Sequence, residues 1–425
     1  MSGLKRLLLG LGFVLLGFGV NAAEEEKSGA ENPLLTRPAL LDGPGTSRQS
    51  LREDGVDIKA SWTQFGQGLV RGFGDHSFEL GGKGDLVVDL DGEKLGLWTG
   101  LYLNIHQEIV AGDDALAQGD GVIIPINTAM AFPRVGDKEA DTSILLTQRF
   151  SNGATLSMGK FNMLDAAART PLIGGGGLDT FMNTAFAAPI SGVTPPYLLG
   201  ASLGVKFDPV SLGVLVYDPR NAQNSDVITE PFSEGVTLSV SSTLSTSLYG
   251  LPGFYSVRGV ISSEESVDLK DVPQLILPPG ISEPVGTAKN PWYVSFNAQQ
   301  FLWQNPDDTS KGWGLFGHVG FSDENPTPVG TSYFFGLAGN AMFEEYPNDR
   351  WGIGYFKYRL SGVLADAIAA SPIDYLIGPE QGVEVFYNHE FLPWLNVTAD
   401  IQLLDGFPIS SSNSVYAGLR TKISF

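Results

Sequence analysis

Apolar and polar residues alternate along this chain over stretches that are long for a globular protein. In residues 78–90 the even positions carry Phe, Leu, Val and Gly, while the odd positions carry mainly Glu, Lys and Asp. Residues 95–106 and 395–403 repeat this period of two. Globular strands usually span about 5 or 6 residues, whereas a tilted strand needs about 9 to 11 to cross a bilayer. The pattern therefore predicts membrane-crossing β-strands with one face toward lipid.

The same reading along the whole chain predicts sixteen strands. They span residues 56–70, 77–90, 95–109, 141–150, 154–161, 198–207, 210–218, 234–246, 253–263, 292–304, 312–321, 332–343, 350–359, 382–390, 394–403 and 415–425. The alternation is least regular in 141–150 and 312–321. An even number of strands is typical of a bacterial single-chain barrel. We therefore predict an all-β fold, a transmembrane antiparallel β-barrel.

The lengths of the connections also alternate. Short turns such as Asp91-Gly92 and Asn152-Gly153 follow the even-numbered segments, and Asx-Gly pairs favour tight hairpins. Long connections mostly follow the odd-numbered ones: 110–140, 162–197, 219–233, 264–291, 322–331, 360–381 and 404–414. The exceptions are 71–76 and 305–311. This parity predicts short periplasmic turns on one rim, long loops on the other, and both chain ends on the periplasmic side.

The beginning of the chain has the layout of a secretory signal. Lys5 and Arg6 precede an apolar run over residues 7–20, and small residues end at Ala22. A membrane anchor is the alternative, but this run is short for a span of about 20 residues. Cleavage after Ala22 or Ala23 both remain open. Removing residues 1–22 moves the formal net charge from −21 to −23, because it removes two cations and no acids.

The remaining chain divides into two parts. Residues 23–55 are predicted to form a periplasmic segment with a short helix over 47–54, ended by Gly55, and residues 56–425 the barrel. The last strand ends in Phe425, a pattern typical of clients of the barrel-assembly machinery, although a soluble edge strand could end in the same way. Closing the first strand onto the last matters, because an open edge in lipid leaves backbone groups unpaired.

Composition excludes several function classes. The chain has no cysteine, so disulfides and thiolate chemistry are excluded, and its four histidines are too scattered to predict a metal site. The acidic balance disfavours nucleic acid or anionic lipid surfaces as partners. No cofactor is expected. The sequence Gly-Ala-Ser-Leu-Gly at 200–204 matches a nucleophile elbow, but it lies inside a predicted strand with no helix after it.

Two blocks of sequence resemble a known family. Glu384-Val385-Phe386-Tyr387-Asn388, Pro393-Trp394-Leu395, Asp400-Ile401-Gln402 and Gly418-Leu419-Arg420 resemble the end of the OprB-type carbohydrate-selective porins. A central block is similar too, with Gly159-Lys160-Phe161-Asn162, Asp165, residues 174–177, Phe181, Asn183 and Phe186. The family's early Trp-Gly-Gly-x-Arg segment appears here with Arg48 but without the tryptophan. The resemblance implies a sixteen-stranded barrel in the outer membrane that passes mono- or small oligosaccharides passively.

A pathway for such solutes can be predicted from the inner faces. A barrel of about sixteen strands encloses water, and aromatic rings with polar groups suit sugars, which have apolar ring faces and many hydroxyls. The third strand would contribute Trp98, Tyr102, Asn104 and Glu108. The connection 162–197 would narrow the pore and contribute Asp165, Arg169, Asp179 and Asn183. Alternatively, this connection forms an extracellular cap with its polar groups solvated.

Two other functions remain open. A general or cation-preferring porin would fit the negative charge, and a barrel hydrolase could use His106 and Glu108 with a serine, although pore lining is the better interpretation of that pair. Liposome swelling would separate transport from catalysis. The expected partners are saccharides, outer-membrane lipid and the barrel-assembly machinery, and the assembly is either a homotrimer or a monomer.

Overall fold

The computed structural model describes residues 33–425 except 44, 120, 135–137, 225, 276–281, 344, 372–376 and 408–412. The predicted signal peptide, residues 1–22, and the start of the periplasmic segment lie outside the described residues. No helix in the described part of the chain has the length and apolar character needed to cross a membrane.

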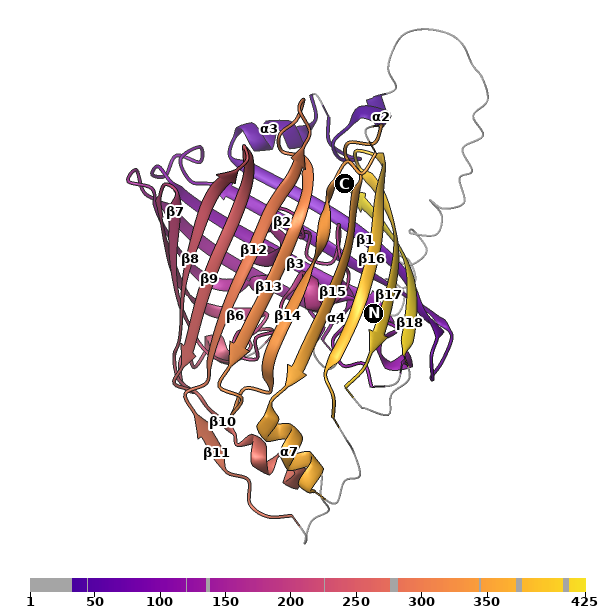
Figure 1. Cartoon of the computed structure of the whole chain (residues 1–425). Coiled ribbons are helices and arrows are strands. Elements are labelled where there is room, and N and C mark those ends of the chain that lie inside the picture. The colour runs from indigo at the N-terminus through magenta and orange to yellow at the C-terminus, as the bar shows by residue number, and fades with distance from the viewer. Residues whose placement is uncertain are drawn as a thin grey trace.

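Sixteen antiparallel strands form a closed barrel, as the alternation predicts (Figure 1). They are β1 (Val56–Arg71), β2 (Phe78–Asp91), β3 (Leu101–Gly112), β4 (Ala140–Arg149), β5 (Ala154–Asn162), β6 (Tyr197–Phe207), β7 (Val210–Tyr217), β8 (Thr237–Leu248), β9 (Leu251–Ser262), β12 (Trp292–Gln304), β13 (Gly312–Ser322), β14 (Val329–Asn340), β15 (Arg350–Leu360), β16 (Glu380–Leu392), β17 (Leu395–Asp405) and β18 (Ser414–Ser424). Each strand pairs with its neighbour in the barrel, and β1 pairs with β18 to close it.

The two faces of the strands have the predicted characters. On β18, Leu419 is 49% exposed on the outer wall, whereas its neighbour Arg420 is 1% exposed inside. On β2, Leu86 is exposed and Lys83 is buried in the same way. The closed barrel leaves no strand edge open, and a bilayer requires this because unpaired backbone groups are costly in lipid.

One predicted strand is too long at its start. β3 begins at Leu101 and not at residue 95, because residues 92–100 form a turn in which Gly96 and Gly100 adopt φ of 82° and 81°. Trp98 is therefore not on an inner strand face. Its ring is 61% exposed, and its Nε1 donates to Gln148 Oε1 at 2.7 Å. This position on the short-turn rim suits an interfacial aromatic residue, not a pore-lining one.

The N-terminal segment lies at the short-turn rim. It contains α2 (Pro33–Thr36) and α3 (Ser47–Glu53), whose N-cap Thr46 accepts from Gln49 N. Arg48 donates from Nε to Ile58 O at 2.7 Å and from Nη1 to Phe425 O, so it contacts both β1 and the chain end. Arg52 bonds to Asp42 at 2.6 Å, and this hydrogen bond holds the pKa of the Asp42 carboxyl below its usual value.

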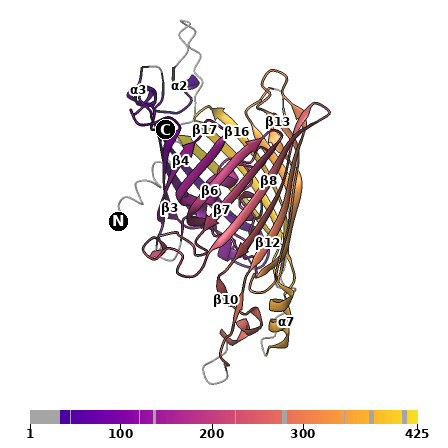
Figure 2. The same cartoon turned by 90° about the vertical axis from the view of Figure 1, so that its left-hand side faces the viewer.

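The opposite rim carries the long connections (Figure 2). A small sheet of β10 (Glu265–Val267) and β11 (Thr287–Lys289), the 3₁₀ helix η3 (Leu269–Leu275) and α7 (Gly362–Ala370) project beyond the strands there. The helix α7 lies in the connection 360–381, for which the sequence predicts only a loop. A further 3₁₀ helix, η2 (Asp226–Ile228), follows β7.

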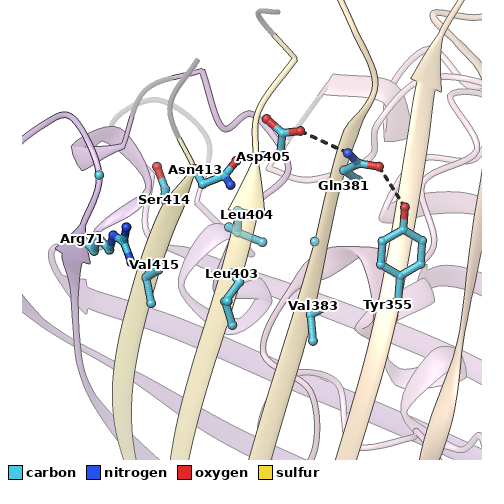
Figure 3. Close-up of a pocket in the computed structure, with 12 residues that line it drawn as sticks. Arg71, Tyr355, Gln381, Val383, Leu403, Leu404, Asp405, Asn413, Ser414 and Val415 are labelled. Atoms are coloured by element: carbon cyan, nitrogen blue, oxygen red, sulfur yellow. Dashed lines mark hydrogen bonds between the residues drawn. The ribbon is translucent and has the colours of Figure 1, made fainter. Parts of the chain in front are cut away.

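A cavity of about 810 Å³ indents the outer wall near this rim (Figure 3). It crosses β15 to β18 and reaches β1. Tyr355 and Gln381 line it together with Arg71 and Asp405. These strand positions share the outward face with the exposed Ile353 and Leu403.

Candidate solute pathway

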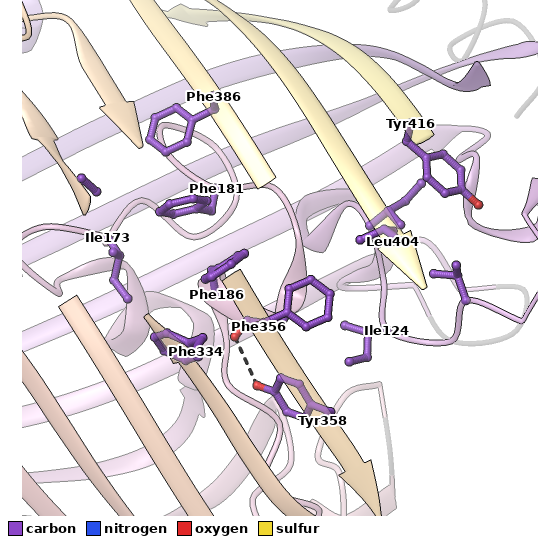
Figure 4. Close-up of a cluster of buried hydrophobic side chains, with 14 of the residues drawn as sticks. Ile124, Ile173, Phe181, Phe186, Phe334, Phe356, Tyr358, Phe386, Leu404 and Tyr416 are labelled. Atoms are coloured by element: carbon purple, nitrogen blue, oxygen red, sulfur yellow. Dashed lines mark hydrogen bonds between the residues drawn. The ribbon is translucent and has the colours of Figure 1, made fainter. Parts of the chain in front are cut away.

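The connection between β5 and β6 folds inside the barrel. It contains α5 (Met163–Ala168) and α6 (Thr184–Ala187), and its Phe181 and Phe186 are fully buried. The two rings stack with centroids 4.5 Å apart. They pack against four inward-facing phenylalanines from β13 to β16: Phe316, Phe334, Phe356 and Phe386 (Figure 4). Such aromatic pairs contribute about 0.5–1.5 kcal/mol each beyond their buried area.

Charged wall residues hold the backbone of the same connection. The Glu384 carboxylate on β16 accepts from the backbone N–H groups of Met182, at 2.5 Å, and Asn183, at 3.1 Å. Arg420 on β18 donates to the carbonyls of Gly177 at 2.7 Å and Thr180 at 3.0 Å. Because buried backbone groups are costly when unpaired, these two side chains determine where the connection lies.

Two further wall contacts involve predicted pathway residues. Lys422 Nζ lies 2.7 Å from Asp179 Oδ2, and Asn183 donates to Gln402 Oε1 at 3.0 Å. Asn183 also caps α6 by accepting from Ala185 N and is fully buried. It therefore has no surface left for a solute. The C-terminal motif residues Glu384, Gln402 and Arg420 thus hold the central motif block inside the barrel.

A second connection, between β3 and β4, also enters the barrel. The sequence pattern predicts a long connection there but not its inward position. It contains η1 (Leu116–Gln118) and α4 (Thr128–Ala131). Glu380 accepts from Ile123 N at 2.9 Å and Ile124 N at 3.1 Å. The buried Val122, Ile124 and Ile126 are the signal that could have revealed it, because a solvated loop does not need three apolar residues at alternate positions.

The two inserted connections bond to each other. Thr128 N donates to Met182 O at 2.8 Å, and Thr184 N donates to Pro125 O at 2.9 Å. Together they form one packed body against β13–β18 and β1. Two segments therefore occupy the barrel interior, and the sequence predicts an inward position for one of them, 162–197.

His106 ties the start of the β5–β6 connection to the neighbouring strands β2 and β3. Its Nδ1 lies 2.9 Å from Asp165 Oδ2, and its Nε2 lies 3.1 Å from Asp85 Oδ1. Both ring nitrogens are thereby occupied by carboxylates. Asp165, predicted to line the pathway, contributes to this anchor at the first turn of α5.

Glu108, the second predicted acid of β3, is a buried structural residue. It is 1% exposed and accepts from Lys83 Nζ at 2.6 Å, Asn162 Nδ2 at 2.9 Å and Tyr197 OH at 2.9 Å. Its oxygens are occupied by these donors. A passing solute cannot reach it in this arrangement.

Asp85, His106 and Glu108 also form a set whose ligand atoms lie within 4.8 Å of one another. The chemistry does not favour a metal there, because the Lys83 ammonium already lies 2.6 Å from Glu108 and 3.8 Å from Asp85. A second cation would be repelled by it.

Two adjoining cavities lie beside the β5–β6 connection. One, of about 660 Å³, is lined by small and proline residues of 188–196 together with Arg258 and Glu264. The other, of about 260 Å³, lies between Thr170 and the inner wall at Asn297. Arg258 donates to Ser239 Oγ at 2.9 Å and to Thr194 Oγ1 at 2.7 Å. Hydroxyl and amide groups therefore dominate the polar lining.

The remaining predicted residues lie around this space or nearer the short-turn rim. Arg169 is the C-cap of α5, and its side chain is exposed. Tyr102 faces inward on β3, with the Arg149 guanidinium carbon 4.5 Å from its ring centroid. Asn104 donates to Asp89 Oδ1 at 2.7 Å. Tyr102 and Asn104 are thus separated along the barrel from the connection that carries Arg169.

A serine and a histidine meet elsewhere on the inner wall. His318 Nε2 lies 3.4 Å from Ser332 Oγ, and its Nδ1 lies 2.7 Å from Asn297 Oδ1. However, Tyr293 OH is closer to the same Nε2, at 3.1 Å, and Ser332 is fully buried. A nucleophile needs access to substrate and an unshared base, so this geometry does not favour hydrolysis.

Comparisons with known proteins agree with this architecture. A family model described as "Carbohydrate-selective porin, OprB family" matches residues 76–425. The high-pH structure of OprB from Pseudomonas putida is 18% identical, with a TM-score of 0.76 over 92% of this chain and 99% of that one. The low-pH structure of that protein is 15% identical, with a TM-score of 0.53 and the same coverage. The outer membrane channel DcaP of Acinetobacter baumannii is 10% identical, with a TM-score of 0.51 over 87% of this chain and 97% of that one. Comparison with curated protein sequences gives no match.

Proposed function

Because the chain belongs to the OprB family of carbohydrate-selective porins, we propose that it carries mono- or small oligosaccharides passively through the space beside its two inserted connections. The observation that supports this most is the pair of adjoining cavities, of about 660 and 260 Å³. Hydroxyl, amide and small apolar groups line them together with larger apolar side chains, among them the rings of Phe132, Phe186, Phe316 and Phe334. Sugars exchange hydrogen bonds with the hydroxyl and amide groups as they leave water, and small side chains leave room for their rings.

The β5–β6 connection sets the width of the pathway in this proposal. It is held to the wall by Glu384 and Arg420, and its exposed Arg169 is the group best placed to meet a solute. Arg169 lies two residues after Ala167, which lines both cavities, so replacing Arg169 by Ala is expected to change single-channel conductance or block by sugars. Unaltered conductance and unaltered block would remove Arg169 from the pathway.

Liposome swelling with saccharides of increasing length tests the function. Ala167 lines both cavities, so Ala167→Trp should slow glucose and maltose entry severalfold and lower conductance. Trp98→Phe, in the exposed turn of the other rim, is the matched control and should swell like the original protein. Absence of swelling with every sugar would refute the carbohydrate function, and equal rates for A167W would place the pathway elsewhere.

A cation-preferring pore is the second candidate, favoured by the formal charge of −21. Several inward-facing acids are paired with cations, including Glu108 with Lys83 and Asp141 with Lys160 at 2.6 Å each. Pairing weakens the field that would select cations. Reversal potentials in a salt gradient decide the point: strong cation selectivity without sugar block would favour this candidate.

Export and assembly complete the proposal. Residues 1–22 would direct secretion, the strand ending at Phe425 would be received by the barrel-assembly machinery, and the chain would act as a channel without catalysis. Native mass spectrometry of the mature protein in detergent would give both the cleavage site, after Ala22 or Ala23, and the choice between monomer and homotrimer.

A further inference from the structure

The outer wall is asymmetric near the long-loop rim. On one side, four outward residues lie opposite one another in register on β7, β8, β9 and β12, and all are apolar and exposed: Val216, Leu238, Ile261 and Trp292. On the other side, outward residues that lie in register across β14 to β17 are polar: Tyr333, Lys357, Gln381 and Asp405. Apolar residues suit a lipid-facing wall at this depth, so the polar row needs a different explanation.

The polar row borders the outer cavity of about 810 Å³, here called the rim pocket (Figure 3). Tyr355 OH donates to Gln381 Oε1 at 2.8 Å, and Gln381 Nε2 donates to Asp405 Oδ2 at 3.1 Å. These bonds hold three polar groups across β15, β16 and β17 at one level. A fixed row of donors and acceptors facing the lipid side can bind a polar head group.

Cations flank the rim pocket. Arg71 lines it from β1, and Lys357 lies directly opposite Gln381 in register. Within the described part of the chain neither side chain forms an ion pair, whereas nearby Arg359 is 2.5 Å from Glu324. Two unneutralised cations near a membrane interface attract phosphate groups.

An apolar surface continues from the rim pocket toward the middle of the wall. Phe335, Ile353, Val385 and Leu403 point outward there and are all exposed. A ligand of this surface therefore has a polar, anionic head and apolar chains that follow the wall. Sugar hydroxyls suit Gln381 and Asp405, phosphates suit Arg71 and Lys357, and acyl chains suit the apolar residues.

We propose that the rim pocket binds the head group of a phosphorylated glycolipid of the outer leaflet, with its acyl chains along β15–β17. The pocket opens toward lipid and not toward the lumen, so it is separate from the solute pathway. The binding does not depend on the proposed sugar transport.

Native mass spectrometry of the full-length protein in detergent, titrated with diphosphoryl lipid A, tests this proposal. Arg71→Gln combined with Lys357→Gln should weaken lipid A binding at least tenfold, because both phosphate contacts lose their charge. Monophosphoryl lipid A should bind the original protein more weakly than the diphosphoryl form. Phosphatidylglycerol, which lacks the sugar, should bind at least tenfold more weakly still and respond little to the double variant.

The matched control neutralises two cations on the opposite rim, Lys94→Gln with Lys311→Gln, and should bind lipid A as the original protein does. Heat-dependent migration on gels checks that each variant is folded, and unchanged liposome swelling shows that the solute pathway is intact. Equal lipid A affinity in R71Q/K357Q and the original protein would overturn the proposal. Binding of phosphatidylglycerol as tight as that of lipid A would also overturn it. So would a dimer that forms in the original protein and in the control variant but not in R71Q/K357Q.

Discussion

Two sides of the lumen are built on opposite principles. The wall formed by β13–β18 presents large rings and buried charged groups, such as Phe356, Glu384 and Arg420, and both inserted connections pack on it. The wall at β7–β9 presents small hydroxyl residues, with Ser239 and Ser241 inward between the exposed Leu238 and Val240. The first side is an aromatic core. On the second side Ser239 is buried beside Arg258, which also donates to Thr194 of the β5–β6 connection. The barrel alone therefore does not define the pathway, and the choice of inward side chains does.

Loss of the aromatic packing should have the largest effect on this contrast. Phe186→Ala removes a ring that contacts Phe181, Phe316, Phe334 and Phe356. Truncation of a buried Phe costs about 3–5 kcal/mol. Because the strands remain paired, we expect local release of the connection, seen as faster hydrogen exchange over residues 180–187 and a larger, noisier conductance. Exchange as slow as in the original protein would show that the rings are not what holds the connection.

Loss of the Glu384 carboxylate should have the next largest effect. Glu384→Ala leaves the N–H groups of Met182 and Asn183 without their acceptor, at about 1–3 kcal/mol for each buried unpaired group. Glu384→Gln keeps one acceptor oxygen, so its effect should lie between those of the original protein and Glu384→Ala. Hydrogen exchange of these two amides and single-channel conductance measure the change. If E384Q and E384A behave alike, the acceptor geometry is not the cause.

Loss of the tie to β3 should be smaller. His106→Ala removes the contacts to Asp165 and Asp85 but leaves the packed body on β13–β18 in place. We expect a cost of about 1.5–3 kcal/mol, since a hydrogen bond to a charged group contributes about this much. Conductance should change modestly and sugar block should shift. Hydrogen exchange over residues 180–187 as fast as in F186A would mean that the contacts to β3 hold the connection as strongly as the aromatic packing does.

A substitution on the wall at β7–β9 should matter least for stability. Ser241→Ala removes one half-buried inward hydroxyl, so the free energy of unfolding should stay within about 0.5 kcal/mol. Thermal unfolding in detergent measures it. Ser241→Trp on the same site should leave stability similar but reduce conductance, because the ring enters the lumen. If S241W left conductance unchanged, the solute pathway would not run beside Ser241.

Sequence alone predicted the barrel well because successive wall residues face lipid and lumen in turn, which requires apolar and polar residues to alternate. The ends of β12, Trp292 and Gln304, match the predicted 292–304, and the sixteen strands and the closure by β18 are confirmed. Alternation failed at residues 95–100, where two glycines turn the chain and Trp98 leaves the predicted face.

The pathway was harder to predict, because it depends on contacts between distant segments. Nothing local in the sequence states that Glu384 accepts from residues 182 and 183, or that Glu108 is enclosed by Lys83 and Tyr197. The role of Arg169, Tyr102 and Asn104 in solute passage stays a prediction. The apolar run at 122–126 was available as a signal for the second inserted connection, because a solvated loop does not need it.

The contact between Arg48 and both ends of the barrel seam has a consequence for biogenesis. Its two acceptors, Ile58 O and Phe425 O, belong to strands at opposite ends of the chain, and Leu40 N donates to Ser424 O beside them at 2.8 Å. An unfinished barrel separates these acceptors, so the N-terminal segment can dock only on a completed one. Docking of α3 through both contacts therefore requires that the first and last strands have already paired.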